Sequence, residues 1–467
     1  MTLGTWRDLV YLLAAIGFIL ALKGLSSPRH ARRGNLLGAT AALVAIGFTF
    51  SDPALRSSGR NLVLAVVAMV IGTAIAVPAA RKVKMTAMPQ MVAIFNGVGG
   101  GAAALVAMTV FLIDAPGKPA VYRIAEVIFG VLVGCVSLAG SAIAFAKLQE
   151  LMTGRPITYP AQQVINALIG LVILGLALAT LVTGSTPLLV VMAVLSLVLG
   201  VIFVLPIGGA DVPVLISLLN SFTGLAVAAS GFTLNSNLLI IAGTLVGASG
   251  MLLTQMMSKA MGRSLPNILF SAFGSVVTAA GGADGTGADA RPVKAGTPED
   301  VGVLLAYANK VAIVPGYGLA VAQAQHTARE LADALAERGV EVYYAIHPVA
   351  GRMPGHMNVL LAGANVPYDQ LKEMDDANPE MGTTDVALVV GANDTVNPAA
   401  NNTPGSPIYG MPIVHADQAK QVIFLKRSMR PGFAGIDNEL LYDPKTTMLF
   451  GDAKETLTKL VAAVGSA

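Results

Sequence analysis

A series of apolar runs, each close to 20 residues long, fills more than half of this chain. A helix needs about 20 apolar residues to cross the hydrocarbon core of a bilayer. The chain is 54% hydrophobic and 12% charged, whereas a soluble domain carries about 25% charged residues. We therefore predict a multi-pass α-helical membrane domain over residues 1–274, with about nine spans near residues 8–26, 35–50, 61–79, 90–113, 124–146, 163–184, 187–205, 212–234 and 238–258.

The first run is interpreted as a span because it has neither the basic start nor the cleavage site of a signal peptide. Charges in the loops predict the orientation, since loops rich in Lys and Arg stay in the cytoplasm. The richer set of alternate loops carries Lys23, Arg29, Arg32, Arg33, Arg81, Lys82, Lys84, Lys147, Arg155, Lys259 and Arg263. This pattern predicts an external N-terminus, an odd number of spans and a cytoplasmic C-terminal part.

Two spans carry an amide, Asn96 in the fourth and Asn220 in the eighth. A polar group in hydrocarbon needs a polar partner or water, so these amides indicate either helix contacts or a polar pathway. Glycines in the same helices and in the ninth span are typical of close helix packing. Asp211, Arg263 and Ser264 lie at span ends, where Asp211 also suits a helix N-terminus. No carboxylate or Lys lies deep in a predicted span, so a pathway here suits protons better than a large solute.

Residues 275–296 are rich in Gly, Ala and Asp and are predicted to be a flexible linker. Residues 297–467 have an ordinary globular composition. Their apolar runs and turns predict strands at 311–314, 340–346, 386–390, 413–415, 421–425 and 448–450, and helices at 298–308, 319–336, 356–362, 368–374 and 454–464. Alternating strands and helices of this kind indicate an α/β domain with a doubly wound parallel sheet.

The first strand of this domain is followed by Gly316, Tyr317 and Gly318 and then by a helical pattern. Strand, glycine turn and helix start is how a Rossmann-like dinucleotide-binding fold begins, because glycines let the backbone approach a pyrophosphate. A domain that selects NAD usually ends its second strand with an acidic residue. Here that strand ends at His347 without a carboxylate, which favours NADP.

Lys426, Arg427 and Ser428 follow an apolar strand, the position of ligand-binding loops in such sheets. Two cations and a hydroxyl suit a 2′-phosphate. The alternative is that Lys426 and Arg427 are an ordinary solvated pair on the surface. Arg352 is in reach of the pyrophosphate or is an ordinary surface residue. Asn393 and Asp394 either order the ligand or form a turn, and Asp394 near a ligand is a candidate titrating group. Two histidines, His347 and His415, are interpreted as structural.

The sequence shows no nucleophile–base pair, metal cluster or flavin motif. Its one cysteine, Cys135, excludes an internal disulfide and a CxxC redox pair. A net charge of +3 without a basic tract gives no indication of nucleic acid. If the domain binds NADP(H), the reaction partner therefore comes from another chain.

Six runs of the sequence resemble the β subunit of proton-translocating NAD(P) transhydrogenases, and the resemblance extends over nearly the whole chain. The runs are GYGLAVAQAQ, HPVAGRMPGHMNVLLA, GANDTVNPAA, FLKRSM, DVPVLISLLNSFTG and MPQMVAIFNG. The resemblance implies direct hydride transfer between NAD(H) on a partner α subunit and NADP(H) on this chain, coupled to proton passage through the membrane. It also implies a dimer of such heteromers.

The resemblance implies site residues as well. NADP(H) would be bound by Gly316, Tyr317, Gly318, Val349, Ala350, Gly351, Arg352, Met353, Pro354, Gly391, Ala392, Asn393, Asp394, Thr395, Gly410, Met411, Lys426, Arg427, Ser428, Gly432, Phe433, Asp452 and Ala453. Asp394 would also take part in catalysis through coupling. The proton path would involve Asn96, Asp211, Asn220, Arg263 and Ser264.

One position departs from the family pattern, because some bacterial relatives have His where this chain has Asn96. An amide does not take up a proton near neutral pH, whereas His does. A titrating group would then come from elsewhere, or water would relay past Asn96. Two other functions stay open from the residues alone: an ion channel or transporter gated by a nucleotide-sensing Rossmann domain, and a nucleotide-binding structural subunit without turnover.

Overall fold

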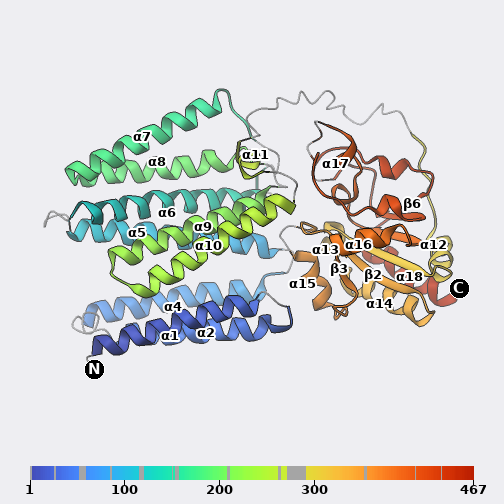
Figure 1. Cartoon of the computed structure of the whole chain (residues 1–467), viewed down its shortest axis with the longest axis horizontal. Helices are drawn as coiled ribbons and strands as arrows, with labels where there is room; N and C mark the ends of the chain where they lie inside the picture. Colours follow the sequence, from blue (N-terminus) through green and yellow to red (C-terminus); the bar gives the residue numbers. More distant parts are fainter. Residues whose placement is uncertain are drawn as a thin grey trace. The chain divides into compact units, whose positions relative to one another are not determined.

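The computed structural model describes residues 3–25, 28–51, 59–84, 87–114, 120–149, 151–152, 157–207, 211–260, 264–270, 291–351, 355–404, 406, 408–432 and 434–467. The chain forms two compact units, a helical one in its N-terminal part and an α/β one in its C-terminal part (Figure 1). The predicted fold class, a helical membrane domain followed by a parallel-sheet α/β domain, is confirmed.

The N-terminal unit is built from long helices. Its described part contains α1 (Leu3–Leu25), α2 (Pro28–Thr49), α4 (Gly59–Lys82), α5 (Met88–Asp114), α6 (Val121–Leu148), α7 (Gln162–Thr183), α8 (Thr186–Val204), α9 (Val212–Thr233) and α10 (Asn237–Ala260), and the short α11 (Leu265–Phe270) follows. Within the described residues, eight helices are long and apolar enough to cross a membrane, namely all of these except α2 and α11.

Helix α2 corresponds to the second predicted span, residues 35–50. It is 22 residues long, but its arginine-rich first turns keep it outside the set of eight apolar helices. Small residues bring it close to α1, since a Cβ added to Gly24 would lie 2.8 Å from the Cα of Gly34. At the other end of this pair, the hydroxyls of Tyr11 and Thr49 are 3.0 Å apart. Helices α1 and α2 therefore form a closely packed hairpin.

Glycines on α9 and α10 serve close helix packing, as their spacing predicted. A Cβ added to Gly224 would lie 2.4 Å from the backbone nitrogen of Gly247, and one added to Gly250 would lie 2.8 Å from that of Ser221. The Ser221 hydroxyl also donates a 2.6 Å hydrogen bond to the carbonyl of Gly247. Any larger side chain at these glycines would push the two backbones apart.

Lys147 has a different environment from the loop position that the sequence suggested. Its side chain is buried near the end of α6. The ammonium donates to the carbonyls of Leu205 at 2.5 Å, Ile207 at 2.8 Å and Val204 at 3.3 Å. A cation at these carbonyls satisfies acceptors that the end of α8 leaves without helical partners. Lys147 therefore fixes the end of α6 to the end of α8.

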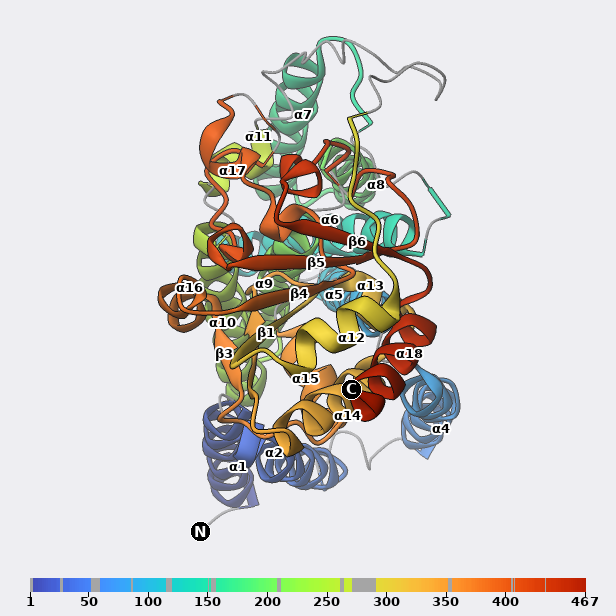
Figure 2. The ribbon, with the colours of Figure 1, turned by 90° about the vertical axis from the view of Figure 1, so that its right-hand side faces the viewer.

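The C-terminal unit contains a six-stranded parallel sheet. Its strands are β1 (Lys310–Pro315), β2 (Glu341–Ile346), β3 (Leu371–Glu373), β4 (Val386–Val390), β5 (Gln421–Lys426) and β6 (Thr446–Phe450). They lie in the order β3-β2-β1-β4-β5-β6 (Figure 2). The order reverses between β1 and β4, which makes this a doubly wound sheet with its switch point at those two strands.

Helices cover both faces of the sheet. They are α12 (Pro298–Ala306), α13 (Tyr317–Val321), α14 (Gln325–Glu337), α15 (His356–Gly363), α16 (Met374–Met381), the short α17 (Ala399–Asn402) and α18 (Ala453–Ser466), with short 3-10 turns η4 (Asp394–Val396), η5 (Ala416–Gln418) and η6 (Glu439–Tyr442). Successive strand residues point to opposite faces. Val311 and Ile313 thus join the core under α12, α14 and α18, while Ala312 and Val314 join the core that includes α16.

Three local predictions were wrong, and one helix was not predicted. Residues 413–415 do not pair with a strand of the sheet. Among the described residues, their one backbone hydrogen bond to a distant segment runs from the N–H of Val414 to the carbonyl of Thr395. The predicted helix at 368–374 is instead a turn followed by β3. The predicted helix at 319–336 breaks between α13 and α14, where Gln323 has a φ of 51°. Helix α16 was not predicted, since Pro379 interrupts its pattern.

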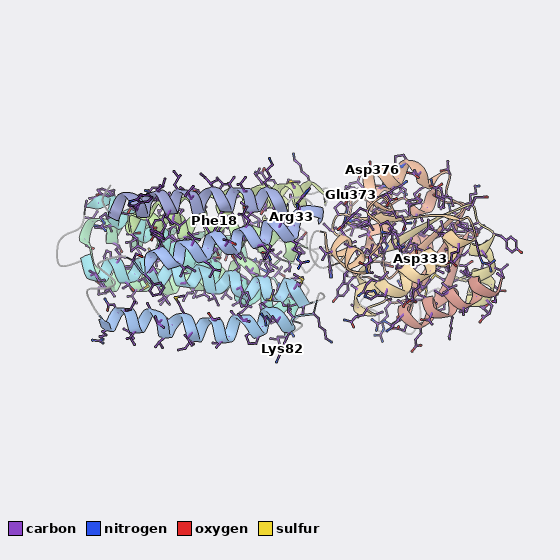
Figure 3. The ribbon with its side chains drawn as sticks, turned by 90° about the horizontal axis from the view of Figure 1, so that it is seen from below. Phe18, Arg33, Lys82, Asp333, Glu373 and Asp376 are labelled. Atoms are coloured by element: carbon purple, nitrogen blue, oxygen red, sulfur yellow. The ribbon has the colours of Figure 1, made fainter. Side chains whose placement is uncertain are left out.

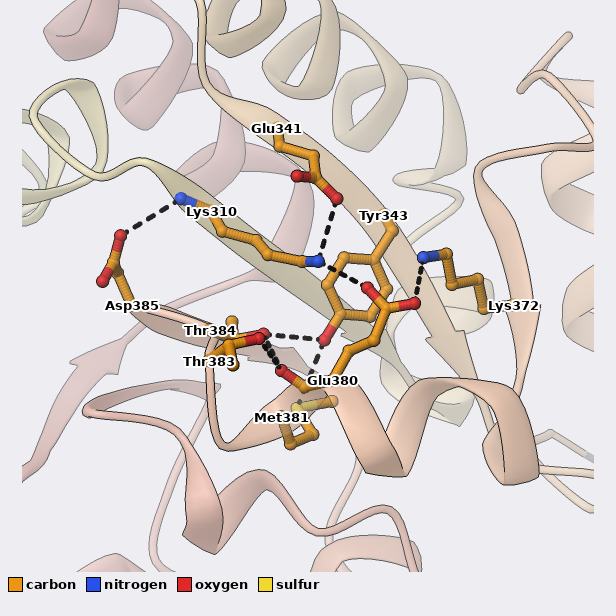
Figure 4. A network of polar contacts seen from close by, with 9 residues as sticks. All are labelled: Lys310, Glu341, Tyr343, Lys372, Glu380, Met381, Thr383, Thr384 and Asp385. Atoms are coloured by element: carbon orange, nitrogen blue, oxygen red, sulfur yellow. Dashed lines mark hydrogen bonds and ion pairs between the residues drawn. The ribbon is translucent and has the colours of Figure 1, made fainter.

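An ion-pair network closes the sheet at the amino ends of β1 and β2 (Figure 4). The Lys310 ammonium lies 2.9 Å from Glu341 and 2.5 Å from Glu380, and Lys372 also pairs with Glu380. Under these cations, the hydroxyl of Tyr343 is 2.8 Å from that of Thr384. The two Lys partners hold the pKa of Glu380 below its usual range. This end of the sheet is thus occupied by structural contacts, and the opposite end remains for a ligand.

Candidate functional site

The carboxyl ends of β1 and β4 bring the two glycine-rich loops together. The backbone N–H of Gly316 donates to Val390 and that of Gly318 donates to Gly391, both at 2.9 Å. A Cβ added to Gly316 would lie 2.3 Å from the backbone nitrogen of Ala392. Gly391 has a φ of 67°, a conformation that favours glycine. Only glycines therefore allow this contact at the switch point, where doubly wound sheets bind ligands.

Asn393 connects the loop after β4 to the loop after β5. Its Oδ1 accepts a 2.9 Å hydrogen bond from the ammonium of Lys426, and its carbonyl accepts one of 3.1 Å from the amide of Asn438. The same ammonium donates to the carbonyl of Arg430 at 3.1 Å. Burial lowers the pKa of Lys426, and the Asp394 carboxylate opposes that shift. The Lys426 ammonium thus joins the loop after β4 to the loop after β5.

Asp394 holds the same segment through both carboxylate oxygens. Oδ1 accepts from the Asn393 amide at 3.0 Å, and Oδ2 accepts from the backbone N–H of Ala434 at 2.8 Å. A Cβ added to Gly432 would lie 2.5 Å from Asp394 Oδ1. The carboxylate therefore lies close to the backbone of Gly432 and Ala434, which gives Asp394 a positioning role.

Arg427 and Ser428 are exposed at the carboxyl end of β5, whereas Lys426 is partly buried. The three residues predicted to share one role thus divide into two that present donors to solvent and one that supports the loop from inside. A guanidinium can bind a phosphate through two parallel hydrogen bonds. The exposed pair is therefore the part of this segment that suits an anionic group.

His347 joins the loop after β2 to the segment around Met411. Its Nε2 donates to the carbonyl of Pro412 at 2.7 Å, and its Nδ1 accepts from the backbone N–H of Val349 at 3.1 Å. Burial lowers the pKa of His347 to about 4, so the ring is neutral at physiological pH. The structural interpretation of His347 agrees with these contacts. Val349, Ala350 and Gly351 form the loop that it supports.

Some of the remaining predicted site residues lie in the described part of the chain, and the others do not. Tyr317 is half-buried against the core, Met411 is buried and Thr395 is partly buried beside Val414. At β6, the Asp452 carboxylate accepts from the N–H of Lys454 and begins α18, and Ala453 lies in the core. Gly410 has a φ of 83°. Arg352, Met353, Pro354, Phe433 and, at the membrane, Arg263 lie outside the described residues.

The described membrane residues predicted for a proton path lie in α5, in α9 and just before α9 and α11. Asn96 is buried in α5 and contacts hydroxyls of α6. Asp211 is buried at the start of α9, Asn220 is half-buried in α9, and Ser264 is exposed before α11. No described contact joins Asn220 to Asn96. The amide of Asn96 instead meets hydroxyls that the sequence analysis did not single out.

These missed residues are Ser137 and Ser141 on α6 and Thr223 on α9. The Asn96 amide donates to Ser141 at 2.9 Å and to Ser137 at 3.3 Å, and the hydroxyls of Ser137 and Thr223 are 2.6 Å apart. Their only signal in the sequence is a hydroxyl within an apolar span, which is common in packed helices. Their proximity to Asn96 depends on how α5, α6 and α9 pack.

Comparison with known proteins agrees with both units. A family model described as NAD(P) transhydrogenase beta subunit matches residues 7–463. The chain is 49% identical over 462 residues to proteins named NAD(P) transhydrogenase subunit beta from Rhodospirillum rubrum and from a designated strain of that species. Each alignment covers 97% of this chain and 98% of the relative. The chain therefore belongs to the NAD(P) transhydrogenase beta subunit family.

Proposed function

We propose that this chain is the NADP(H)-binding and proton-conducting subunit of a transhydrogenase. Hydride passes directly between NAD(H) on a partner α subunit and NADP(H) on this chain, and the step is coupled to proton translocation across the membrane. The observation that carries the proposal is the presence, in one chain of this family, of apolar helices long enough to cross a membrane and of a doubly wound sheet with glycine loops at its switch point.

The residues around the switch point fit NADP(H). Gly316 and Gly391 carry no side chain, which leaves their backbone accessible at the position where a dinucleotide would bind. Two exposed donors, Arg427 and Ser428, suit the 2′-phosphate. Strand β2 ends at Ile346 and is followed by His347, not by the carboxylate that an NAD ribose would need. When bound, the nicotinamide supplies the hydride donor or acceptor. The protein supplies orientation, because Asn393 and Asp394 fix the surrounding loops.

The proposed cofactor site keeps all the residues predicted from the sequence, including those outside the described ranges. Asp394 is assigned a role in coupling through the loop that it holds. The proposed proton path includes Asn96, Asp211, Asn220, Arg263 and Ser264. Proton passage would favour one of two forms of the NADP(H) site, open or occluded, and so would make hydride transfer depend on the proton.

The proposal also covers topology and assembly. The domains would be residues 1–274 in the bacterial inner membrane, a linker at 275–296 and a cytoplasmic NADP(H)-binding domain at 297–467, with the N-terminus outside. Arg33 on α2 and Lys82 on α4 lie at the same end of the membrane helices (Figure 3), which supports a shared cytoplasmic side. A crossing α2 gives the required odd number of spans. The complex with the α subunit would be a dimer of heteromers.

Reconstitution tests the proposal. The chain is placed in vesicles with its NAD(H)-binding partner, and reduction of NAD⁺ by NADPH is followed together with a pH-sensitive dye. We expect hydride transfer accompanied by a pH change across the membrane. Hydride transfer without proton movement would refute the coupling. Nucleotide-gated ion flux without hydride transfer would support the channel alternative instead.

A further inference from the structure

The last part of the predicted linker, residues 291–296, lies along the sheet beside β6. The backbone N–H of Met448 donates to the carbonyl of Lys294 at 2.7 Å, and that of Gly296 donates to the carbonyl of Met448 at 3.0 Å. Val293 packs against the core that includes α16. This part of the linker is therefore fixed to the α/β unit before the first helix of that unit begins.

Arg291 extends this attachment to a segment near the cofactor loops. Its guanidinium lies 2.7 Å from the carboxylate of Asp437 and 4.0 Å from the ring centre of Tyr442. The hydroxyl of Tyr442 donates to the same carboxylate at 3.3 Å. A guanidinium binds a carboxylate through its donors and stacks on an aromatic ring through its face. Both contacts of Arg291 therefore hold it in one position, against Asp437.

The segment 434–438, which contains Asp437, holds the loop after β4 at three points. The contacts are hydrogen bonds from the N–H of Ala434 to Asp394 at 2.8 Å, from the amide of Asn438 to the carbonyl of Asn393 at 3.1 Å, and from the amide of Asn397 to the carbonyl of Asp437 at 2.9 Å. Asn397 and Asn438 are buried, and a buried amide that loses its partner costs free energy. The loop after β4 therefore follows the position of Asp437.

We propose that Arg291 is a positioning residue for NADP(H), which acts through Asp437 to stabilise the arrangement of the loop after β4 that retains the bound cofactor. The inference rests on the NADP(H) site proposed above. Both side chains of the ion pair are half-exposed, so the pair adds little to the stability of the whole unit. The same small free energy changes the ratio of two loop arrangements several-fold. The effect of Arg291 thus lies in the lifetime of bound NADP(H).

Release of NADPH tests this proposal in the full-length chain assembled with its NAD(H)-binding partner. Bound NADPH is displaced by excess NADP⁺ without added NAD(H), and the change in NADPH fluorescence gives the release rate. Arg291→Gln and Asp437→Asn each remove the ion pair, and Arg291→Lys keeps the charge. Lys420→Gln is the matched control. It also removes an exposed cation from a 2.7 Å ion pair, with Asp385 before the first residue of β4, at the opposite end of that strand from the cofactor loops.

We expect Arg291→Gln and Asp437→Asn to speed NADPH release by about threefold to fivefold. The double variant should be no faster than the faster single variant, because both substitutions remove the same contact. Arg291→Lys should recover most of the wild-type lifetime, and Lys420→Gln should match the wild type. Since salt screens exposed charges, the wild type and Arg291→Gln should release NADPH at nearly equal rates at about 1 M ionic strength.

A wild-type release rate in Arg291→Gln would overturn the proposal. Equal acceleration by Lys420→Gln would overturn it as well, since that result means a general loosening of the unit. Multiplied effects in the double variant would show that Arg291 does not act through Asp437. Failure of the wild-type chain to bind NADPH at all would instead refute the proposed function, so the two proposals fail through different measurements.

Discussion

Asn393 shows how single polar side chains organise the cofactor loops. Its Oδ1, Nδ2 and backbone carbonyl contact Lys426, Asp394 and Asn438 respectively. From the sequence, the same residue was equally compatible with an ordinary turn, because Asn favours turns for local reasons. Two of these partners, Lys426 and Asn438, lie far along the chain, and only the packing of β4 beside β5 brings them close to Asn393. Residue type thus indicated Asn393 as a candidate but did not predict which contacts it makes.

Arg427 is predicted to read the 2′-phosphate. Arg427→Ala should weaken NADPH binding by roughly tenfold to a hundredfold, because a hydrogen bond to a charged group contributes about 1.5–3 kcal/mol. Binding of NADH, which lacks that phosphate, should change little. Titration calorimetry of both nucleotides on the purified full-length chain measures the difference. Arg338→Ala, which removes an exposed guanidinium that donates to Gly465, is the control, and equal weakening of both nucleotides by Arg427→Ala would contradict the assignment.

His347 is predicted to lower the free energy of unfolding of the C-terminal unit (the soluble unit) in mild acid. An unfolded imidazole has a pKa of about 6.5, whereas that of folded His347 is about 4. Between these values the unfolded state binds a proton that the folded state does not bind. Stability is therefore complete above about pH 6.5 and falls as the pH drops toward 4, by up to roughly 3 kcal/mol.

Urea unfolding of the soluble unit in the detergent-solubilised chain measures this loss. His347→Gln should show a smaller decrease than the wild type between pH 6.5 and 4.5, while replacement of the exposed His326 by Gln should leave the decrease unchanged. Asp385 does not contribute in this window. Its hydrogen bond from Lys420 lowers its pKa to about 2, so its stabilisation is lost only as the pH falls below about 4. Identical decreases in the wild type and His347→Gln would contradict the prediction.

At the scale of elements, the sequence predicted most strands and missed the irregular parts. The buried runs of β1, β4 and β5 are continuous and bounded by polar or glycine residues, so each gives a clear signal. Strand β3 has only three residues at the sheet edge, too few for a period. Ile413 and Val414 are as apolar as a strand, but they fill the core beside the loops rather than extend the ladder. Their hydrophobicity correctly predicted that they are buried, but the strand inferred from it was wrong.

The contact between the two glycine loops should not tolerate a side chain. Gly316→Ala would place a Cβ 2.3 Å from the backbone nitrogen of Ala392, and overpacking of this kind typically costs about 1–3 kcal/mol. We expect a lower unfolding free energy of the soluble unit together with weaker NADPH binding. Gly382→Ala is the control, because no atom lies within 4 Å of that Cβ and its φ of −63° suits alanine. Wild-type stability and binding in Gly316→Ala would show that the contact can relax.

At the scale of the whole molecule, the apolar runs and the glycine turn predicted two units of different class, and both are present. The sequence could not predict which hydroxyls meet Asn96, because that depends on the packing of three helices far apart along the chain. Nor could charge alone determine the status of α2, whose arginines lie within the helix. The close packing of α2 on α1 favours its crossing the membrane beside α1.

Topology provides the test at this scale. Cys135 is the single cysteine, so Cys135→Ser gives a background without thiols into which one cysteine is introduced at a time. In intact cells, a membrane-impermeant maleimide should label Ser51→Cys, just after α2, and Ala120→Cys, just before α6. Lys84→Cys, after α4, should react only once the membrane is opened. If α2 does not cross, Ser51 still lies outside, because α4 separates it from Lys84. The turn between α1 and α2 then lies outside as well, so Leu25→Cys at the end of α1 will be labelled in intact cells instead of protected. That result would show that the nine-span orientation is wrong, even if the C-terminal unit binds NADP(H) as proposed.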